Sequence, residues 1–226
     1  TAHHPLVHTG ILCGIFSVVR NFGGSDNLAA AIYSLLQMAA LAGIFTGISG
    51  FLKKEHAPAW LQVGTILYLC LFPFHGMMAV YTTKDTIFAG IFVLCVIRIY
   101  RMCTRPEVWL NGAAKIAEAV FWFVLCFLFR NNGMHTLLLG APFLLFFLKG
   151  CRKQVAVIFI CVFAVYSFYN GPLLNMLHAE PGNSREAYSI VMQTLGRTYV
   201  SGGKITEEEW QVIRPVMDEE TLAQYT

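Results

Sequence analysis

Charged residues are scarce in this sequence. Asp, Glu, Lys and Arg together make up 13% of its 226 residues, whereas a soluble globular domain carries about 25%. So few charges cannot solvate the whole surface of a water-soluble protein. The acidic residues are also unevenly placed, because eight of the 13 follow residue 173.

Several common motifs are absent as well. The chain contains no P-loop, no GxGxxG, no HExxH and no GxSxG motif, and it has no basic stripe of the kind that binds nucleic acid. Its seven cysteines lie mostly within or beside apolar runs, and they show neither CxxC nor zinc-site spacing. They are expected to be small packing residues. No nucleic-acid partner and no resident cofactor are predicted.

Long apolar runs take the place of charge. Hydrophobic residues make up 56% of the chain, and its mean hydropathy is +0.58. No Asp, Glu, Lys or Arg occurs in residues 28–52, 56–83 or 131–148. About 20 apolar residues in a helix cross the hydrocarbon core of a bilayer. These runs therefore predict membrane-spanning helices, with the membrane lipid bilayer as the main partner of the chain.

The predicted fold class is all-α, a polytopic transmembrane helix bundle of about six spans over residues 28–173. An interfacial helix segment (1–27) precedes the bundle and a small helical tail (174–226) follows it. The first apolar stretch, residues 5–19, is short for a span and is expected to lie in the outer membrane interface. The six predicted spans are residues 28–52, 59–82, 85–103, 113–130, 133–149 and 154–173.

The basic residues orient these spans, because loops rich in Lys and Arg stay in the cytoplasm. Nine basic residues fall on one side of the bundle, whereas Lys84 and Arg130 fall on the other. The side with nine is predicted to be cytoplasmic, so both ends of the chain are predicted to be extracytoplasmic. Within the nine, Arg98 and Arg101 are expected to snorkel toward the cytoplasmic interface. The nine are Lys53, Lys54, Arg98, Arg101, Arg105, Lys115, Lys149, Arg152 and Lys153.

The tail changes in composition and predicts a small solvated helical unit. Ser201-Gly202-Gly203 is expected to end one helix. Thr206 followed by Glu209 has the spacing of a capping box that opens another. Asp218 is a candidate N-cap for a third short helix that runs through Gln224. About fifty residues make a poor core alone, so the tail is expected to dock on the membrane domain or on further sequence.

Unusual polar residues gather on the predicted outer side. Thr82 or Thr83 can cap a helix with Asp85 in its first turn, which is a purely structural interpretation. The alternative is functional, because an ionisable pair, Lys84 and Asp85, ends a long uncharged run at membrane depth. Arg130 precedes Asn131-Asn132-Gly133, a sequence typical of a tight turn between two helices.

Three further features are less specific. His3-His4-Pro5 opens the first helix, either as a simple helix start or as a place where His4 meets a phosphate or an anionic headgroup. Gln37 is expected to form hydrogen bonds across helices. Pro73 is expected to kink the second span and to free backbone carbonyls.

The order of these motifs resembles a bacterial polytopic family that looks like a branch of the GT-C glycosyltransferase superfamily, which includes protein O-mannosyltransferases and lipid A aminoarabinose transferases. The resemblance covers nearly the whole chain, and each motif is weak alone. The features that carry it are His3-His4-Pro5, Gln37, Phe72-Pro73, Lys84-Asp85-Thr86-Ile87-Phe88, Arg130-Asn131-Asn132-Gly133, Arg185-Glu186, Gln193, Arg197 and Glu207-Glu208-Glu209.

The resemblance implies a function. GT-C enzymes take a sugar from a polyprenyl-phosphate donor and transfer it outside the cytoplasm, here on the extracytoplasmic side of a bacterial cell membrane. By resemblance, Asp85 is the candidate catalytic residue, and His3, His4, Lys84 and Arg130 are candidates for binding the donor phosphate. Lys84 stands where better-known members carry proline. The resemblance also implies a further span, an acidic outer loop and a divalent metal in a longer parent protein, with the span and the loop before Thr1, so this chain alone is expected to be inactive.

Two other classes of function compete with this one. A transporter or lipid flippase would carry ionisable residues in the middle of its spans and inverted repeats, and the sequence shows neither. An assembly protein would use the tail as a docking module. An acidic residue in an outer loop just before Thr1 would favour the enzyme over both.

Overall fold

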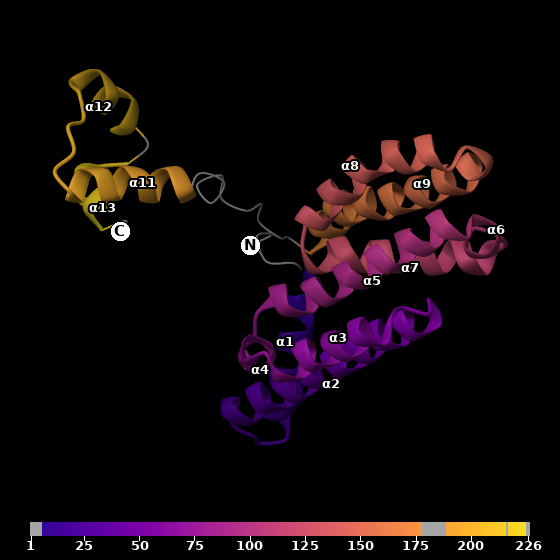
Figure 1. Ribbon diagram of the computed structural model, residues 1–226. Coiled ribbons are helices and arrows are strands. Elements are labelled where there is room, and N and C mark those ends of the chain that lie inside the picture. Colours follow the sequence, from indigo (N-terminus) through magenta and orange to yellow (C-terminus); the bar gives the residue numbers. More distant parts are fainter. Residues whose placement is uncertain (1–5, 178–188, 216, 225–226) are drawn as a thin grey trace. The chain divides into compact units, whose positions relative to one another are not determined.

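Apolar runs become helices in this chain because a helix satisfies its own backbone N–H and C=O groups, as a lipid environment requires. The computed structural model describes residues 6–177, 189–215 and 217–224. Within these ranges every regular element is helical (Figure 1), which confirms the all-α prediction. The described residues fall into two compact units. Residues 6–177 form one, here called the bundle unit, and residues 189–215 and 217–224 form the other, here called the C-terminal unit.

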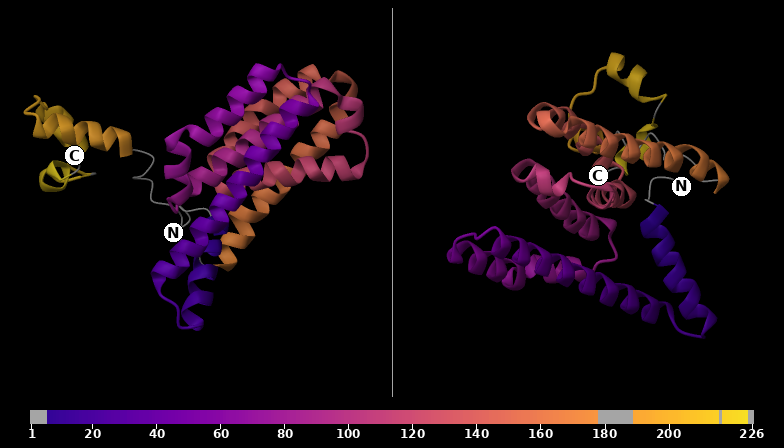
Figure 2. Two further views of the ribbon diagram at one scale, coloured as in Figure 1. Left: turned by 60° about the horizontal axis from the view of Figure 1, so that its bottom comes forward. Right: turned by 90° about the vertical axis from the view of Figure 1, so that its right-hand side faces the viewer.

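The bundle unit consists of helices whose long segments run in alternating directions (Figures 1 and 2). Helices are found at all six positions where spans were predicted. The elements are α1 (Leu6–Asn21), α2 (Asp26–Lys54), α3 (Ala59–Leu71), α4 (Pro73–Val80), α5 (Lys84–Thr104), α6 (Pro106–Trp109), α7 (Ala113–Phe129), α8 (Asn132–Phe147), η1 (Lys149–Cys151), α9 (Arg152–Phe168), η2 (Tyr169–Leu173) and α10 (Leu174–Met176).

Three helical segments of the described ranges are long and apolar enough to cross a membrane. They are α2 with 29 residues, α5 with 21, and the continuous stretch Lys149–Met176 with 28. The pair α3 and α4 makes a fourth if it forms one bent span. Helices α7 and α8 have 17 and 16 residues, which corresponds to about 24–26 Å, short of the roughly 30 Å core of a bilayer. A multi-pass membrane protein with three or four such helices is therefore supported.

The bend between α3 and α4 confirms the predicted effect of Pro73. The two helices meet at 49°. Pro73 is the first residue of α4, and Phe72 before it has extended backbone angles. Proline has no N–H and clashes with the preceding turn, so it kinks or breaks a helix, and here the helix breaks before it. Past the bend, the end of α4 contacts α2 and α5 through hydrogen bonds from Gln37 and Thr86 to its backbone carbonyls.

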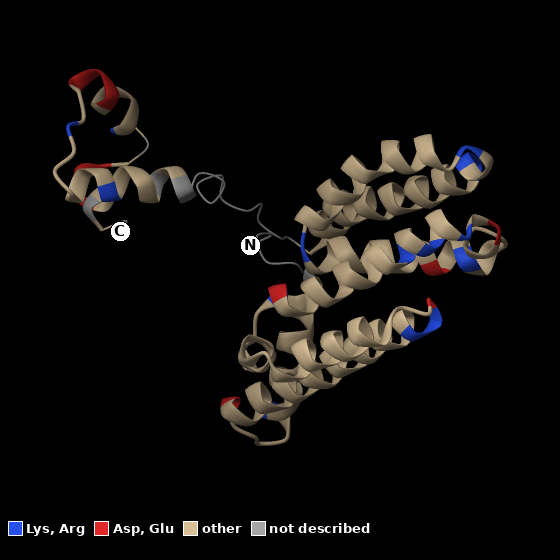
Figure 3. Cartoon of the chain, in the orientation of Figure 1, with Lys and Arg blue, Asp and Glu red and all other residues tan. Residues whose placement is uncertain are grey.

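Helix α7 lies at the centre of the bundle unit and contacts α1, α5, α8 and α9. Ala119, Phe123 and Cys126 are fully buried along one face of it, at the spacing of successive helical turns. They pack in one core with Cys95 of α5 and Ile158 of α9. The charged residues of this unit lie toward the ends of its helices (Figure 3).

Much of the outer surface of the bundle unit is apolar. Helix α3 buries no residue, and Trp60 and Leu71 on it are 74% and 70% exposed. On α8, Leu139 and Phe147 are 73% and 71% exposed. Such surface in water would drive aggregation, whereas in a bilayer it faces lipid tails. The apolar exterior agrees with the membrane location that the composition predicts.

Gly133 allows α8 to turn back closely onto the end of α7. A Cβ atom at this position would lie 2.8 Å from the carbonyl oxygen of Cys126 and 2.9 Å from its sulfur. A side chain there would have to push backbone apart. The turn predicted at Asn131-Asn132-Gly133 is confirmed, because α7 ends at Phe129 and α8 begins at Asn132.

Gly133→Ala is expected to destabilise the protein by about 1–3 kcal/mol, the usual cost of overpacking. The measurement is the apparent melting temperature in detergent. Gly140→Ala is the matched control, since Gly140 lies in the same helix and nothing approaches its Cβ position within 4 Å. That change should be neutral or slightly stabilising, because alanine favours helix. Equal melting temperatures for the two variants would contradict the close approach.

The C-terminal unit contains α11 (Ser189–Val200), α12 (Glu207–Ile213) and α13 (Glu219–Ala223). The predicted capping box is present, because Thr206 and Glu209 exchange hydrogen bonds at the start of α12. The amide and hydroxyl of Thr206 donate to the Glu209 carboxylate and hold the pKa of Glu209 below its ordinary value. Asp218 caps α13 through the amide of Thr221, as predicted. Gly202, with φ +72°, follows the end of α11.

Candidate functional site

The start of α5 presents the predicted polar residues at one end of the bundle unit. Thr83 caps the helix, because its hydroxyl oxygen accepts a hydrogen bond from the Asp85 amide at 3.3 Å. Lys84 is the first helical residue, and Asp85 stands in the first turn, where the helix dipole favours a carboxylate. The structural interpretation of Thr83 as an N-cap is therefore confirmed.

Asp85 also has a long-range partner. The Nη1 atom of Arg130, the residue directly after α7, donates to Oδ1 of Asp85 at 2.8 Å. The Arg130 guanidinium lies over the ring of Phe88, with 5.6 Å to the centroid. The side chains of Arg130 and Asp85 are 42% and 50% exposed. An exposed pair of this kind adds about 0–1 kcal/mol to stability, so the fold does not depend on it and both groups can reach a ligand.

The loop that leads into α5 is held by a buried glutamine. Gln37 of α2 is 3% exposed. Its Nε2 atom donates to the carbonyls of Met78, Ala79 and Tyr81 at 3.1, 3.0 and 2.7 Å. These carbonyls lie at the end of α4, where no further turn of helix can satisfy them. The predicted hydrogen bonds of Gln37 across helices are confirmed, and they fix the backbone just before Thr83.

A second helix is tied to Gln37 through a buried hydrogen-bond chain. The Tyr33 hydroxyl donates to Oε1 of Gln37 at 2.9 Å, and Nε2 of His8 lies 2.9 Å from the same hydroxyl. Since the hydroxyl proton goes to Gln37, the N–H of His8 is the donor in the second contact. His8 and Tyr33 are 6% and 5% exposed. The chain links α1, α2 and the end of α4 into one rigid support.

An apolar cavity of about 420 Å³ lies beside this support, between α2, α3, α4 and α5. Most of its wall is aliphatic and aromatic, with Leu41 and Phe45 from α2 and Phe74 from α4. Asp85 belongs to the same wall. His75 also lines it, and its Nε2 atom is buried with no hydrogen-bond partner among the described residues. The arrangement combines space for an apolar group with a carboxylate and a guanidinium.

The residues at this site do not by themselves fit a divalent metal. Such an ion prefers several oxygen ligands. Within residues 6–177, 189–215 and 217–224, no group of three or more His, Cys, Asp or Glu side chains is gathered in one place. Asp85 is engaged with Arg130 instead. No step of the chemistry below is therefore assigned to a metal.

A protein-family model matches almost the whole chain. The model of a family of unknown function, DUF6020, matches residues 1–225. The chain belongs to the DUF6020 family. No curated protein and no solved structure matches this DUF6020 chain. The family carries no assigned activity, so the resemblance to GT-C glycosyltransferases stays a prediction.

The structure of the DUF6020 chain brings together two of the five predicted site residues. Asp85 and Arg130 form an ion pair although 45 residues separate them in the sequence. Lys84 adjoins them and makes no ion pair among the described residues. His3 and His4 lie outside the described residues, so their predicted part in binding phosphate stays a prediction.

The sequence interpretation missed the support behind the site. His8 and Tyr33 were not singled out. One signal was available for Tyr33, because it precedes Gln37 by four residues, and residues at this spacing share a helical face. His8 gave no signal, since its partner lies 25 residues away on another helix.

The interpretation of Arg98 was wrong. Its side chain was predicted to snorkel to the interface, but the residue is 4% exposed. Its guanidinium pairs with Glu118 of α7 and lies over the ring of Trp109. The Glu118 carboxylate and the Trp109 indole stabilise the positive charge of Arg98 inside the protein, so the side chain does not extend to the membrane interface.

Proposed function

We propose that this chain is the membrane part of a glycosyltransferase that moves a sugar from a polyprenyl-phosphate donor to an acceptor on the extracytoplasmic side of a bacterial cell membrane. The observation that carries the proposal is the position of Asp85. Its carboxylate pairs with Arg130 and also lines an apolar cavity among the helices. A lipid-linked sugar phosphate needs these features side by side: an apolar space for the lipid, a cation for the phosphate and a carboxylate for the acceptor.

The chemistry follows from the transfer itself. The acceptor oxygen bonds to the anomeric carbon of the sugar, the bond from that carbon to the phosphate oxygen breaks, and polyprenyl phosphate leaves with the electron pair. The acceptor gives up its proton, and a carboxylate such as Asp85 assists this step. Arg130 and Lys84 provide cationic donors for the phosphate, on which negative charge grows as the bond breaks.

The proposed topology has six crossings, over 28–52, 59–82, 85–103, 113–130, 133–149 and 154–173. Two observations support it. Successive segments alternate in direction (Figure 1), and Lys and Arg gather at one end of the bundle unit, where α2, α5 and α8 finish (Figure 3). Under the positive-inside rule that end faces the cytoplasm. The start of α5, the turn before α8 and both termini are then extracytoplasmic, and the two shorter helices cross where the bilayer thins locally.

Cysteine labelling tests this topology. In a background without native cysteines, Ser201→Cys is expected to react with a membrane-impermeant maleimide in intact cells, whereas Gly150→Cys should react only after permeabilisation. Gly150 is a suitable position because nothing lies within 4 Å of an added Cβ atom. Labelling of Gly150→Cys but not of Ser201→Cys in intact cells would show that the orientation is the opposite of the one proposed. Labelling of both would contradict the six-span arrangement.

A transfer assay tests the activity. Membranes from cells that overproduce the full-length protein are incubated with a panel of radiolabelled short-chain polyprenyl-phosphate hexoses. The expected result is release of polyprenyl phosphate together with labelled acceptor, above the level in membranes without the protein. Movement of the intact donor between leaflets without cleavage would instead identify a lipid flippase. Neither cleavage nor movement would favour an assembly protein.

A further inference from the structure

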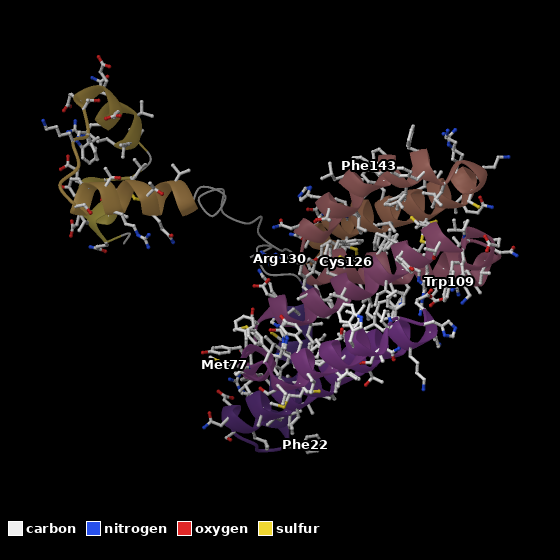
Figure 4. The ribbon with its side chains drawn as sticks, viewed as in Figure 1. Phe22, Met77, Trp109, Cys126, Arg130 and Phe143 are labelled. Carbon is white, nitrogen blue, oxygen red and sulfur yellow. The ribbon has the colours of Figure 1, made fainter. Side chains whose placement is uncertain are left out.

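A second cluster of charged side chains lies at the opposite end of the bundle unit from Asp85 and Arg130. Figure 4 shows Arg130 at one end of the helices and Trp109 at the other. Trp109 ends the short helix α6, which connects α5 to α7. Three cations contact its ring: Arg98 at 4.7 Å, Arg101 at 4.7 Å and Lys115 at 4.4 Å from the centroid. These residues and Glu118 are here called the Trp109 cluster.

The charges of the Trp109 cluster do not balance. Glu118 is its one carboxylate and pairs with both Arg98 and Lys115, the latter at 3.3 Å. Since each cation lies within 4.7 Å of the same ring centroid, they are closer to one another than the Debye length of about 10 Å at 0.1 M salt. Salt therefore screens their repulsion only in part. Glu55 does not neutralise the cluster, because it pairs with Arg105. Glu107 of α6 is exposed and forms no ion pair among the described residues.

The cluster also contains donors without acceptors. The Nη1 atom of Arg98 and the Nε atom of Arg101 are buried and have no hydrogen-bond partner among the described residues. Stacking on an indole attracts the guanidinium charge but does not replace a hydrogen-bond acceptor. An unpaired buried donor is costly. Two such donors beside an excess of positive charge indicate that the acceptor comes from outside the chain.

We propose that the Trp109 cluster binds the phosphate group of an anionic membrane lipid. A phosphate diester carries a negative charge and presents several acceptor oxygens, which suits guanidinium groups. Access is from the side of Lys115, whose side chain is 40% exposed. The site is separate from the proposed transferase site and does not depend on that activity.

A lipid fits the surroundings better than free phosphate does. Tyr100 of α5 is 45% exposed and packs against Phe51, the ring over which Arg101 also lies, and Val108 of α6 is 51% exposed. These apolar side chains offer a surface for acyl chains next to the cations. The cluster also lies at the cationic end of the bundle unit (Figure 3), where basic groups attract anionic headgroups. Inorganic phosphate would use the same donors but gain nothing from the apolar surface.

Native mass spectrometry of the detergent-purified protein tests the proposal. The protein is mixed with equimolar phosphatidylglycerol and phosphatidylcholine that carry the same acyl chains. The phosphatidylglycerol adduct should dominate. Arg101→Gln and Lys115→Gln should each lower the ratio of the two adducts about fivefold, the contribution of one cation near an anionic headgroup. Arg98 is left unchanged because it is 4% exposed, so its replacement would disturb the packing between α5 and α7.

The matched control is Lys54→Gln, which removes one positive charge from the same end of the bundle unit but outside the Trp109 cluster. It should leave the adduct ratio unchanged. Equal adducts of the two lipids, or an equal loss in Lys54→Gln, would overturn the proposal. Displacement of phosphatidylglycerol by millimolar inorganic phosphate would show that the cluster binds free phosphate and not a lipid headgroup. Size-exclusion profiles like that of the wild type establish that the variants are folded.

Discussion

Asp85→Asn is expected to lower the turnover of sugar transfer about 10²–10⁴-fold, the usual effect of losing an acid or base group. Donor binding should change little or become tighter. The reason lies in the ion pair, because the Arg130 guanidinium, 2.8 Å from the Asp85 carboxylate, becomes free to meet the donor phosphate. Turnover and the donor dissociation constant are measured on the full-length protein with a polyprenyl-phosphate hexose.

Lys84→Ala should have the reverse effect. An ammonium group binds phosphate as a point charge, so its loss weakens donor binding more than it lowers turnover.

Asp26→Asn is the matched control for Asp85→Asn. Asp26 also pairs with an arginine, Arg20 at 2.7 Å, and it is similarly exposed, but it does not line the apolar cavity. If Asp85→Asn and Lys84→Ala alter neither constant, these residues are only the polar start of a helix.

Gln37→Met is expected to reduce both stability and turnover. Methionine has a similar length but cannot donate to the carbonyls of Met78, Ala79 and Tyr81, which Gln37 holds. Leaving a buried polar group unsatisfied costs about 1–3 kcal/mol. The loop into α5 would then loosen, so Asp85 would lose its fixed position. The apparent melting temperature in detergent and the transfer rate are the two measurements.

Gln62→Met provides the comparison for Gln37→Met. Gln62 makes one local hydrogen bond, to the carbonyl of Ala57 five residues earlier, and it connects no two distant segments. Its replacement should lower the melting temperature less and leave turnover unchanged. A melting temperature that falls equally in both variants would show that the contacts of Gln37 between α2 and α4 add nothing beyond an ordinary side-chain hydrogen bond.

The local features of the fold could be predicted because each depends on neighbours in the sequence. The bend at Pro73 follows from a missing N–H. The caps at Thr83, Thr206 and Asp218 follow from short polar side chains placed before helical stretches. The positions of the helices follow from apolar runs. The number of spans is harder to predict, because α7 and α8, with 17 and 16 residues, are shorter than the roughly 20 residues that cross a bilayer.

Contacts between distant segments could not be predicted in the same way. Arg98 has the sequence context of a snorkelling residue, and only the packing of α7 against α5 supplies the Glu118 carboxylate that allows its burial. The partner of Asp85 likewise depends on where α7 ends. His8 contacts Tyr33 only because α1 folds back along α2.

The sequence by itself determined that this protein is helical and belongs in a membrane, because sparse charge and long continuous apolar runs favour helices that satisfy their own backbone groups in lipid. It also placed Lys84 and Asp85 at a helix start, since capping is local. The tertiary structure alone decided which charges meet. The pairing of Asp85 with Arg130 and the gathering of three cations around Trp109 depend on the rotation and crossing of helices far apart in the chain. Many side chains together set that geometry, and no short stretch of sequence encodes it.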